Sequence, residues 1–142
     1  MLFAIDIGNS NIHVGFFEDD KLVHTFRLGT DKNRTSDEYV LLLKSISEFN
    51  SYKMSFFDSA IIGSVVPAVT PILQRAVEAV LNVTPIIVGP GVKTGFPIKI
   101  DDPSELGADL AANTAGAIYK VGFPSIVIDF GTATTVSVID ET

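Results

Sequence analysis

Asp6-Ile7-Gly8-Asn9-Ser10 joins two segments that have the residue pattern of strands, and the fold prediction starts from this connection. Residues 1–5 are apolar, and residues 12–17 place large apolar side chains at every second position. A period of two predicts a β-hairpin rather than a helix. Gly8 permits a tight turn and the close approach of a ligand. The N–H groups and side chains of Asn9 and Ser10 can bind an anion.

Asp6 lies at the end of the first predicted strand, where a carboxylate can hold a metal ion directly or through water. Taken alone, the stretch also fits an ordinary turn, since Asp, Gly, Asn and Ser are common in turns. A second copy favours the functional interpretation: Phe3-Ala-Ile-Asp-Ile-Gly8 returns as Ile126-Val-Ile-Asp-Phe-Gly131. Small polar residues 132–135 and an alternating segment at 136–140 follow it. Two copies predict a duplicated fold with two phosphate loops facing each other across a cleft.

Composition narrows the class of protein. The chain has 142 residues, 46% of them hydrophobic and 19% charged, which is typical of a compact globular domain with a core. A net charge of −7 argues against a nucleic-acid partner, since phosphate backbones need clustered Lys and Arg. A glycine loop with Mg²⁺ can still bind ATP in an acidic protein. With no cysteine, no basic N-terminal region and no apolar run near the ~20 residues of a membrane span, we expect a cytoplasmic protein without a membrane partner.

Helices and strands are predicted to alternate between the two copies. Thr35-x-x-Glu38 is a capping box that should start an amphipathic helix. One buried stripe is expected on that helix, formed by Tyr39, Leu42, Leu43, Ile46 and Phe49. The other expected elements are strands at 22–28, 59–66 and 86–88, a helix from Thr70-Pro71, and a helix from a cap at Asp102 to Lys120 with Gly122 just after it. His24 is expected to be solvated, and His13 to lie beside the phosphate turn.

This order predicts an α/β fold of the ribonuclease-H-like type, with a mixed sheet flanked by helices. Residues 1–122 would form the first domain. Residues 123–142 would supply only the first hairpin of a second, incomplete domain. Because a lone hairpin is marginally stable in water, these strands should pack on a neighbour, swap between copies or belong to a longer protein, and we expect the chain to be truncated.

Asp109 is the candidate for acid–base chemistry, within Gly107-Ala108-Asp109 inside or at the first turns of the last helix. A carboxylate there could deprotonate a hydroxyl that attacks a γ-phosphate. The alternative is structural, because a helix N-terminus stabilises a carboxylate through its dipole. Asn113, one turn later, is expected to be a buried or capping amide.

These motifs together resemble those of the type III pantothenate kinase family, which includes proteins called Bvg accessory factor and belongs to the actin- and hexokinase-like ATPase superfamily. The resemblance rests on four stretches: Asp6-Ile-Gly-Asn-Ser10, Pro90-Gly-Val-Lys-Thr-Gly95, Asp102-Pro-Ser-Glu-Leu-Gly-Ala-Asp109 and Asp129-Phe-Gly-Thr-Ala-Thr-Thr135. It implies ATP-dependent phosphorylation of pantothenate to 4′-phosphopantothenate, the first step of coenzyme A synthesis. It also implies Mg²⁺, a monovalent cation (K⁺ or NH₄⁺) and, for the full-length form, a homodimer.

The resemblance also implies roles for individual residues. Asp109 would be the catalytic base, Asp129 would hold the monovalent cation, and Asp6 would hold Mg²⁺ through phosphate or water. The ATP-binding residues would be Asp6, Ile7, Gly8, Asn9, Ser10, Asn11, Ile12, His13, Gly131 and Thr132. The pantothenate-binding residues would be Ile100, Gly107, Ala108, Asp109 and Leu110.

Two positions depart from the family pattern. The family motif commonly reads Gly-Ala-Asp-Arg, where this chain has Leu110, and many members have tyrosine in place of Ile100. Leucine cannot give a carboxylate-bearing substrate the bidentate partner that arginine would. Three alternatives therefore stay open: a non-catalytic nucleotide-binding regulator, another kinase or phosphatase of the superfamily, and, least favoured by the acidic charge, a metal nuclease.

Overall fold

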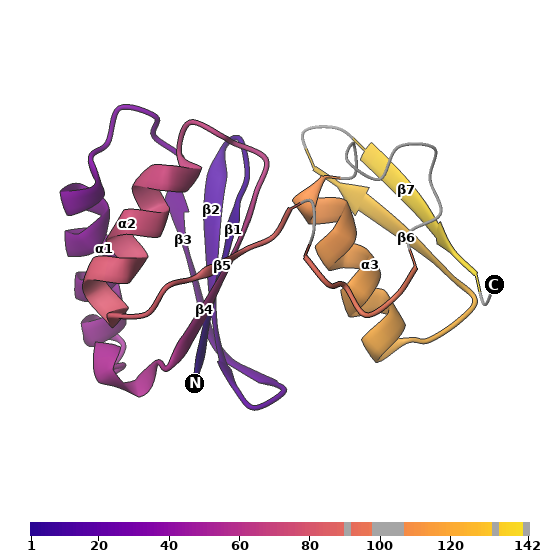
Figure 1. Cartoon of the computed structure of the whole chain (residues 1–142), viewed down its shortest axis with the longest axis horizontal. Helices are drawn as coiled ribbons and strands as arrows, with labels where there is room; N and C mark the ends of the chain where they lie inside the picture. The colour runs from indigo at the N-terminus through magenta and orange to yellow at the C-terminus, as the bar shows by residue number, and fades with distance from the viewer. Residues whose placement is uncertain (90–91, 98–106, 132–133, 141–142) are drawn as a thin grey trace. The chain divides into compact units, whose positions relative to one another are not determined.

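A computed structural model describes residues 1–89, 92–97, 107–131 and 134–140 of the chain. It contains two compact units, Met1–Val88 and Gly89–Thr142, which are described one at a time (Figure 1). The division after Val88 reflects only the compactness of each unit. It does not test the predicted domain boundary after residue 122, which stays a prediction. Within the described residues, no helix has both the length and the apolar character needed to cross a bilayer.

The first unit is built on a five-stranded mixed sheet with the strand order β3-β2-β1-β4-β5. β1 lies at its centre, antiparallel to β2 on one side and parallel to β4 on the other. The strands are β1 Leu2–Ile7, β2 Asn11–Glu18, β3 Lys21–Gly29, β4 Ser59–Ser64 and β5 Ile86–Ile87. The change from antiparallel to parallel pairing at β1 places the ends of β1 and β4, and the β1–β2 turn, at one edge of the sheet.

Helices α1 (Ser36–Phe49) and α2 (Thr70–Leu81) cover one face of this sheet, and the short 3₁₀ helix η1 (Met54–Phe56) precedes β4 (Figure 1). The core lies between the helices and the sheet, because alternate residues of each strand point toward the helices. Its fully buried large side chains are Phe3, Ile7, Ile12, Val14, Phe16, Tyr39, Leu43, Ile62, Val69, Leu73 and Val77. The residues between them on each strand therefore lie on the opposite face.

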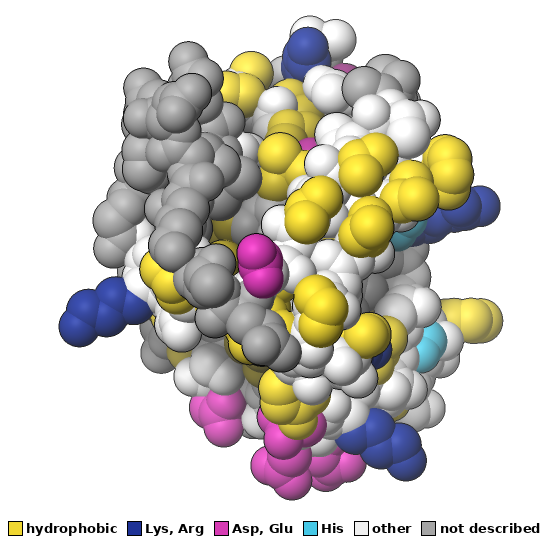
Figure 2. Space-filling view, turned by 90° about the vertical axis from the view of Figure 1, so that its right-hand side faces the viewer, with side chains coloured by type: hydrophobic (Ala, Val, Ile, Leu, Met, Phe, Trp, Pro, Cys, Tyr) yellow, Lys and Arg dark blue, Asp and Glu magenta, His cyan; other side chains and the backbone are white. Residues whose placement is uncertain are grey.

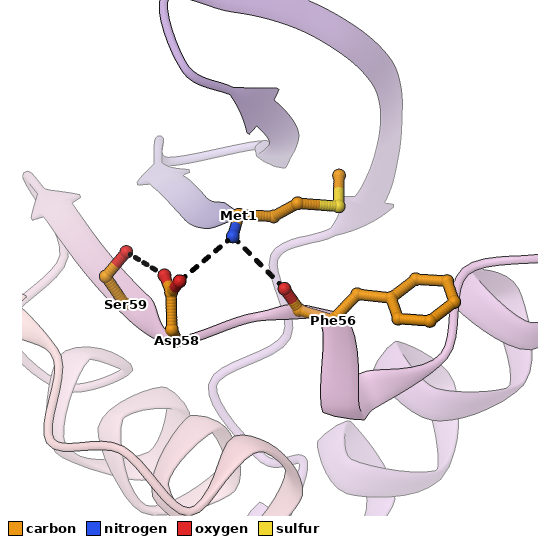
Figure 3. Close-up of polar contacts among 4 residues, drawn as sticks. All are labelled: Met1, Phe56, Asp58 and Ser59. Carbon is orange, nitrogen blue, oxygen red and sulfur yellow. Dashed lines mark hydrogen bonds and ion pairs between the residues drawn. The ribbon is translucent and has the colours of Figure 1, made fainter.

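The start of β1 is fastened to the start of β4 by polar contacts of the chain's first residue (Figure 3). The Met1 ammonium group lies 3.3 Å from Asp58 Oδ2 and donates a hydrogen bond to the Phe56 carbonyl at 3.1 Å. The Ser59 hydroxyl donates to Asp58 Oδ1 at 2.9 Å. The Ser59 hydrogen bond, followed by the ammonium group, lowers the pKa of Asp58 below its usual value.

The second unit packs helix α3 (Ala108–Lys120) against a two-stranded antiparallel sheet of β6 (Ser125–Phe130) and β7 (Thr134–Ile139). Alternation along β6 and β7 turns one set of side chains toward α3 and leaves the other set exposed. The exposed set is mostly apolar, and Figure 2 shows hydrophobic side chains gathered on one surface. Its large members are Ile126, Ile128, Phe130, Val136 and Val138, which are 53–81% exposed.

The predicted mixed α/β sheet, the capping box at Thr35 and both Asp-Gly hairpins are confirmed. The predicted start of the last helix at Asp102 is wrong, because Gly107 has an extended backbone (φ −61°, ψ 150°) and α3 begins after it. Asp102 itself lies outside the described residues. The helix ends as predicted, with Gly122 at φ 85° directly after the C-cap.

Two side chains lie where the sequence did not place them. Phe49 is 88% exposed rather than part of the buried stripe of α1, because Ser47, one turn after Leu43, takes the inward position. His24 is only partly exposed, and its Nε2 atom is buried, so it is less solvated than expected. It pairs with Phe16 in the β2–β3 register, so it faces the core side, and its ring centroid lies 5.2 Å from that of Tyr52.

The capping box makes the stability of α1 dependent on pH. The backbone N–H of Thr35 donates to Glu38 Oε2 at 2.7 Å, and this bond, followed by the Thr35 hydroxyl, lowers the pKa of Glu38 below its usual 4.5. A carboxylate with a lowered pKa stabilises the fold above its unfolded-state pKa, and that stabilisation is lost as the pH falls through the folded-state value. We expect Glu38→Gln to destabilise the protein at about pH 7, with a gap to wild type that narrows below about pH 4.5. Urea unfolding across this range measures the gap, and a gap that stays constant would contradict the assignment.

His24 gives a second prediction. Its Nε2 atom is buried and has no hydrogen-bond partner among the described residues, although Phe16, Phe26 and Tyr52 surround the ring. A buried polar atom without a partner costs about 1 kcal/mol or more. We therefore expect His24→Phe to raise the free energy of unfolding by about 1 kcal/mol, whereas His24→Ala should lower it by removing ring contacts. Denaturant unfolding measures the free energy of unfolding of both variants. If both lose the same amount, the buried Nε2 atom carries no free-energy cost.

Candidate functional site

The turn between β1 and β2 is held in shape by backbone hydrogen bonds. The N–H of Gly8 donates to the Asn11 carbonyl at 2.9 Å. A Cβ atom at position 8 would lie 3.1 Å from that same oxygen, so any larger residue would push the turn open. The close packing explains why glycine follows the strand at this position.

Two carbonyls of the turn are bonded to one residue at the end of β3. The Thr30 hydroxyl donates to the Gly8 carbonyl at 2.7 Å, and the Thr30 N–H donates to the Ser10 carbonyl at 3.0 Å. In the described part of the chain, no hydrogen bond takes the N–H of Asn9 or of Ser10, and both residues are exposed. Two consecutive N–H groups without partners form a binding site suited to an anion such as phosphate.

The end of β4 adds polar groups at the same edge of the sheet. Ser64 pairs with Ile7, the last residue of β1, and the Val65 N–H donates to the Ile7 carbonyl at 3.0 Å. The Ser64 hydroxyl accepts a hydrogen bond from Thr70, the first residue of α2, at 2.8 Å. The carboxyl ends of parallel strands and the N-terminus of the following helix therefore meet beside the turn, an arrangement that binds phosphates in many α/β proteins.

A row of charged or polar side chains crosses the face opposite the helices. Asp6 is paired with His13, and His13 is paired with Arg27, so the three residues stand side by side on β1, β2 and β3. All three are exposed, while their neighbours in the strands are buried or partly buried against the core. The row gives the turn one carboxylate and two groups able to contact an anion.

The carboxylate fits magnesium in one particular way. Among the described residues, no three histidine or acidic side chains come together as a complete metal site. Asp6 is a single carboxylate next to a turn suited to phosphate, and Mg²⁺ bound to nucleotides commonly takes one or two carboxylates plus phosphate oxygens and water. The residues present therefore fit a metal that comes with a phosphorylated ligand.

The second unit holds Asp109 near the start of α3. Asp109 is the second residue of the helix, nearer its start than a helix beginning at Asp102 would place it, and its Oδ1 accepts a hydrogen bond from the Leu110 N–H at 2.9 Å. A Cβ atom at Gly107 would collide with this same Oδ1. Because glycine has no Cβ atom, position 107 leaves space for the Asp109 carboxylate. This is a physical reason for the spacing Gly-x-Asp.

The structure connects α3 with the second Asp-Gly hairpin. Asn113 lies one helical turn after Asp109, on the same side of the helix, and its Nδ2 donates to Asp129 Oδ2 at 2.8 Å. The amide N–H occupies one acceptor site of the carboxylate, and its other acceptor sites can bind a cation. The sequence did not reveal this hydrogen bond, because Asn113 was expected to be only a buried or capping amide.

The remaining predicted site residues differ in their burial and in whether the structure describes them. Ile7 and Ile12 are buried core residues next to the turn, so their backbone alone could contact a ligand. Ala108 is buried and Gly131 is exposed. Ile100 and Thr132 lie outside the described residues. The expected cleft between the two Asp-Gly loops stays a prediction.

Known proteins share both the sequence and the fold. The family model for type III pantothenate kinase matches residues 2–142. A type III pantothenate kinase of Bifidobacterium longum (strain DJO10A) is 45% identical over 141 residues, covering 99% of this chain and 55% of the relative. One from Halalkalibacterium halodurans is 43% identical, with 99% and 56% covered. The chain thus spans about half the length of these relatives.

A solved structure supports the predicted fold. A proposed N-acetylglucosamine kinase from Porphyromonas gingivalis aligns with a TM-score of 0.55 at 16% identity, covering 99% of this chain and 44% of that one. At this identity the likeness shows the fold alone, and it agrees with the predicted mixed sheet flanked by helices. With the family model matching from residue 2 to the last residue, the chain belongs to the type III pantothenate kinase family.

Proposed function

We propose that this chain carries the phosphate-binding turn and the catalytic base of an ATP-dependent pantothenate kinase, which makes 4′-phosphopantothenate in the first step of coenzyme A synthesis. The observation that carries the proposal is the pair of exposed N–H groups at Asn9 and Ser10, next to Asp6. Membership of the family supplies the substrate class.

In this proposal the turn binds the terminal phosphates of ATP. The N–H groups of residues 9 and 10 offer directed donors, and His13 and Arg27 add donors from the neighbouring strands. Such local groups outweigh a net charge of −7, because fixed dipoles act at contact distance while distant surface charges are screened by salt. Mg²⁺ bound by Asp6 through phosphate or water would neutralise charge on the transferred group. Gly131 and Thr132 of the second Asp-Gly loop would contact the same nucleotide.

Asp109 would act on the other substrate. The primary hydroxyl of pantothenate attacks the γ-phosphorus, its proton passes to the Asp109 carboxylate, and the bond to the ADP oxygen breaks. Gly107, Ala108, Leu110 and Ile100 would line the pantothenate site. Asp129, held by Asn113, would bind a monovalent cation (K⁺ or NH₄⁺). We further propose that the whole protein is a cytoplasmic homodimer without nucleic-acid or membrane partners.

The base assignment predicts the effect of one substitution. In the whole natural protein, Asp109→Asn should lower the rate of pantothenate-dependent ADP release by 10²- to 10⁴-fold, the usual contribution of a general base. The matched control is Asp37→Asn, because Asp37 is also the second residue of a helix and loses the same favourable interaction with a helix N-terminus. A coupled ADP assay measures both variants. If Asp109→Asn keeps the rate of the control, Asp109 is not the base.

One observation favours a second function. Leu110 stands where the family motif commonly has arginine, so a carboxylate-bearing substrate lacks a bidentate partner at that position. A protein that binds nucleotide without transferring phosphate, and acts as a regulator, would fit this change. Calorimetry would then show ATP binding while assays with pantothenate and its analogues show no ADP. Turnover of any of them would exclude this alternative.

We also propose that residues 123–142 begin a second domain, completed by chain that follows them in a longer protein. The longer relatives support this, since this chain covers only 55% of one of them. The apolar face of β6 and β7 supports it too: three cross-strand pairs, Ile126 with Val138, Ile128 with Val136 and Phe130 with Thr134, occupy the side away from α3. An apolar surface of this kind on a two-stranded sheet is expected to pack against another layer.

This proposal predicts that the natural protein has a mass well above the 15.2 kDa of this chain. It also predicts that the 142-residue chain binds a dye for exposed apolar surface, such as anilinonaphthalene sulfonate, more strongly than the natural protein does. Mass spectrometry of the protein from its natural source and dye fluorescence at equal molar concentration test the two parts. A natural mass of 15.2 kDa, or equal dye binding by a longer protein, would contradict the second domain.

A further inference from the structure

We infer that Thr30 is a positioning residue of the phosphate-binding turn, and that its hydroxyl sets the direction of the N–H groups that meet the nucleotide. The inference rests on the proposed function, because it concerns how the same turn is made ready for phosphate. Thr30 has not been implicated by any of the sequence motifs considered above. It lies 22 residues after Gly8 and belongs to a different strand connection.

The geometry of the peptide bond gives the first step. A peptide unit is planar and trans, so the carbonyl of one residue and the N–H of the next point in opposite directions within one rigid plane. The Thr30 hydroxyl bonds the Gly8 carbonyl at 2.7 Å, which fixes the plane that also contains the Asn9 N–H. The Thr30 N–H bonds the Ser10 carbonyl at 3.0 Å and fixes the peptide unit after Ser10.

The peptide unit that joins Asn9 to Ser10 is therefore held between two fixed units. Gly8 can rotate more freely than other residues, so without a bond to its carbonyl the plane would sample several orientations. A donor that must be reoriented on binding contributes less affinity than a preorganised one, because the entropy of ordering is subtracted. Thr30 removes that cost before the ligand arrives.

Thr30 is itself well fixed. The β2–β3 register pairs Asn11 with Gly29, which brings the next residue, Thr30, beside Ser10. On its other side, the backbone of Asp31 is bonded twice by the hydroxyl of the fully buried Tyr39. That hydroxyl accepts from the Asp31 N–H at 3.2 Å and donates to the Asp31 carbonyl at 3.1 Å. The position of the Thr30 hydroxyl is thus determined by the core.

A comparison of three substitutions in the whole natural protein tests the inference. Thr30→Val keeps the shape of the side chain and the backbone bond to Ser10 but loses the hydroxyl, whereas Thr30→Ser keeps the hydroxyl. Thr25→Val makes the same chemical change at an exposed position of β3, the strand that ends just before Thr30, and serves as the control. We expect Thr30→Val to raise the KM for ATP about tenfold while the KM for pantothenate stays within about twofold. Thr30→Ser and Thr25→Val should remain near wild type.

The outcomes separate this inference from the proposed function. A wild-type protein that turns over ATP and a Thr30→Val variant that matches Thr25→Val would overturn the role of Thr30 and leave the kinase proposal standing. Equal rises in both KM values would indicate a general structural loss and would also overturn it. A wild-type protein with no ATP turnover and no ATP binding would contradict the proposed function itself. If valine disturbs folding by circular dichroism, Thr30→Ala removes the same hydroxyl with less bulk and carries the same comparison.

Discussion

The alternation of side chains along β1 is the constraint on which the rest of the structure depends. Phe3, Ile5 and Ile7 point into the core beneath the helices, so Asp6 between them must lie on the opposite face. Because β1 is paired on both sides, its register cannot slip by one residue without exposing the entire apolar set. The same packing that stabilises the sheet therefore presents the carboxylate to solvent at the end of the strand.

In the proposed function, local order and local charge let an acidic protein bind a highly charged anion. The backbone N–H dipoles of the turn carry no net charge, so they need no counterion, and they can contact a phosphate directly. His13 and Arg27 lie in one row with Asp6 across β1, β2 and β3. A carboxylate and two groups able to contact an anion therefore lie on neighbouring strands. The negative charge of the remaining surface is screened by salt over about 10 Å and need not oppose binding at the turn.

Contacts between residues close in sequence could be predicted. Contacts that depend on which face of a strand or helix meets its partner in the tertiary structure could not. The capping box joins Thr35 and Glu38 within one turn, and both Asp-Gly hairpins follow from alternation and turn residues, so the sequence contains all the information needed. The core position of His24 depends on the phase of β3 relative to β2, which a register irregularity at Phe16 and Phe17 adjusts. The hydrogen bond between Asn113 and Asp129 depends on which face of α3 meets the hairpin. The predicted start of α3 at Asp102 was wrong because the extended backbone of Gly107, which the cap at Asp102 and the proline after it do not reveal, makes the helix begin at Ala108.

The order of the strands has a consequence for how the chain reaches this structure. β1, β2 and β3 are joined by short turns, so their contacts link residues close in sequence, whereas β1 and β4 pair Leu2 with Ser59 across an intervening helix. Local pairings close small loops and form early, while parallel pairings must first overcome the entropy of a long loop. We therefore expect the three-stranded meander, including the bond between Thr30 and Gly8, to assemble before the long-range half of the sheet docks onto β1. On this route the ligand-binding turn would belong to the folding nucleus, and substitutions in it would slow folding as well as weaken binding.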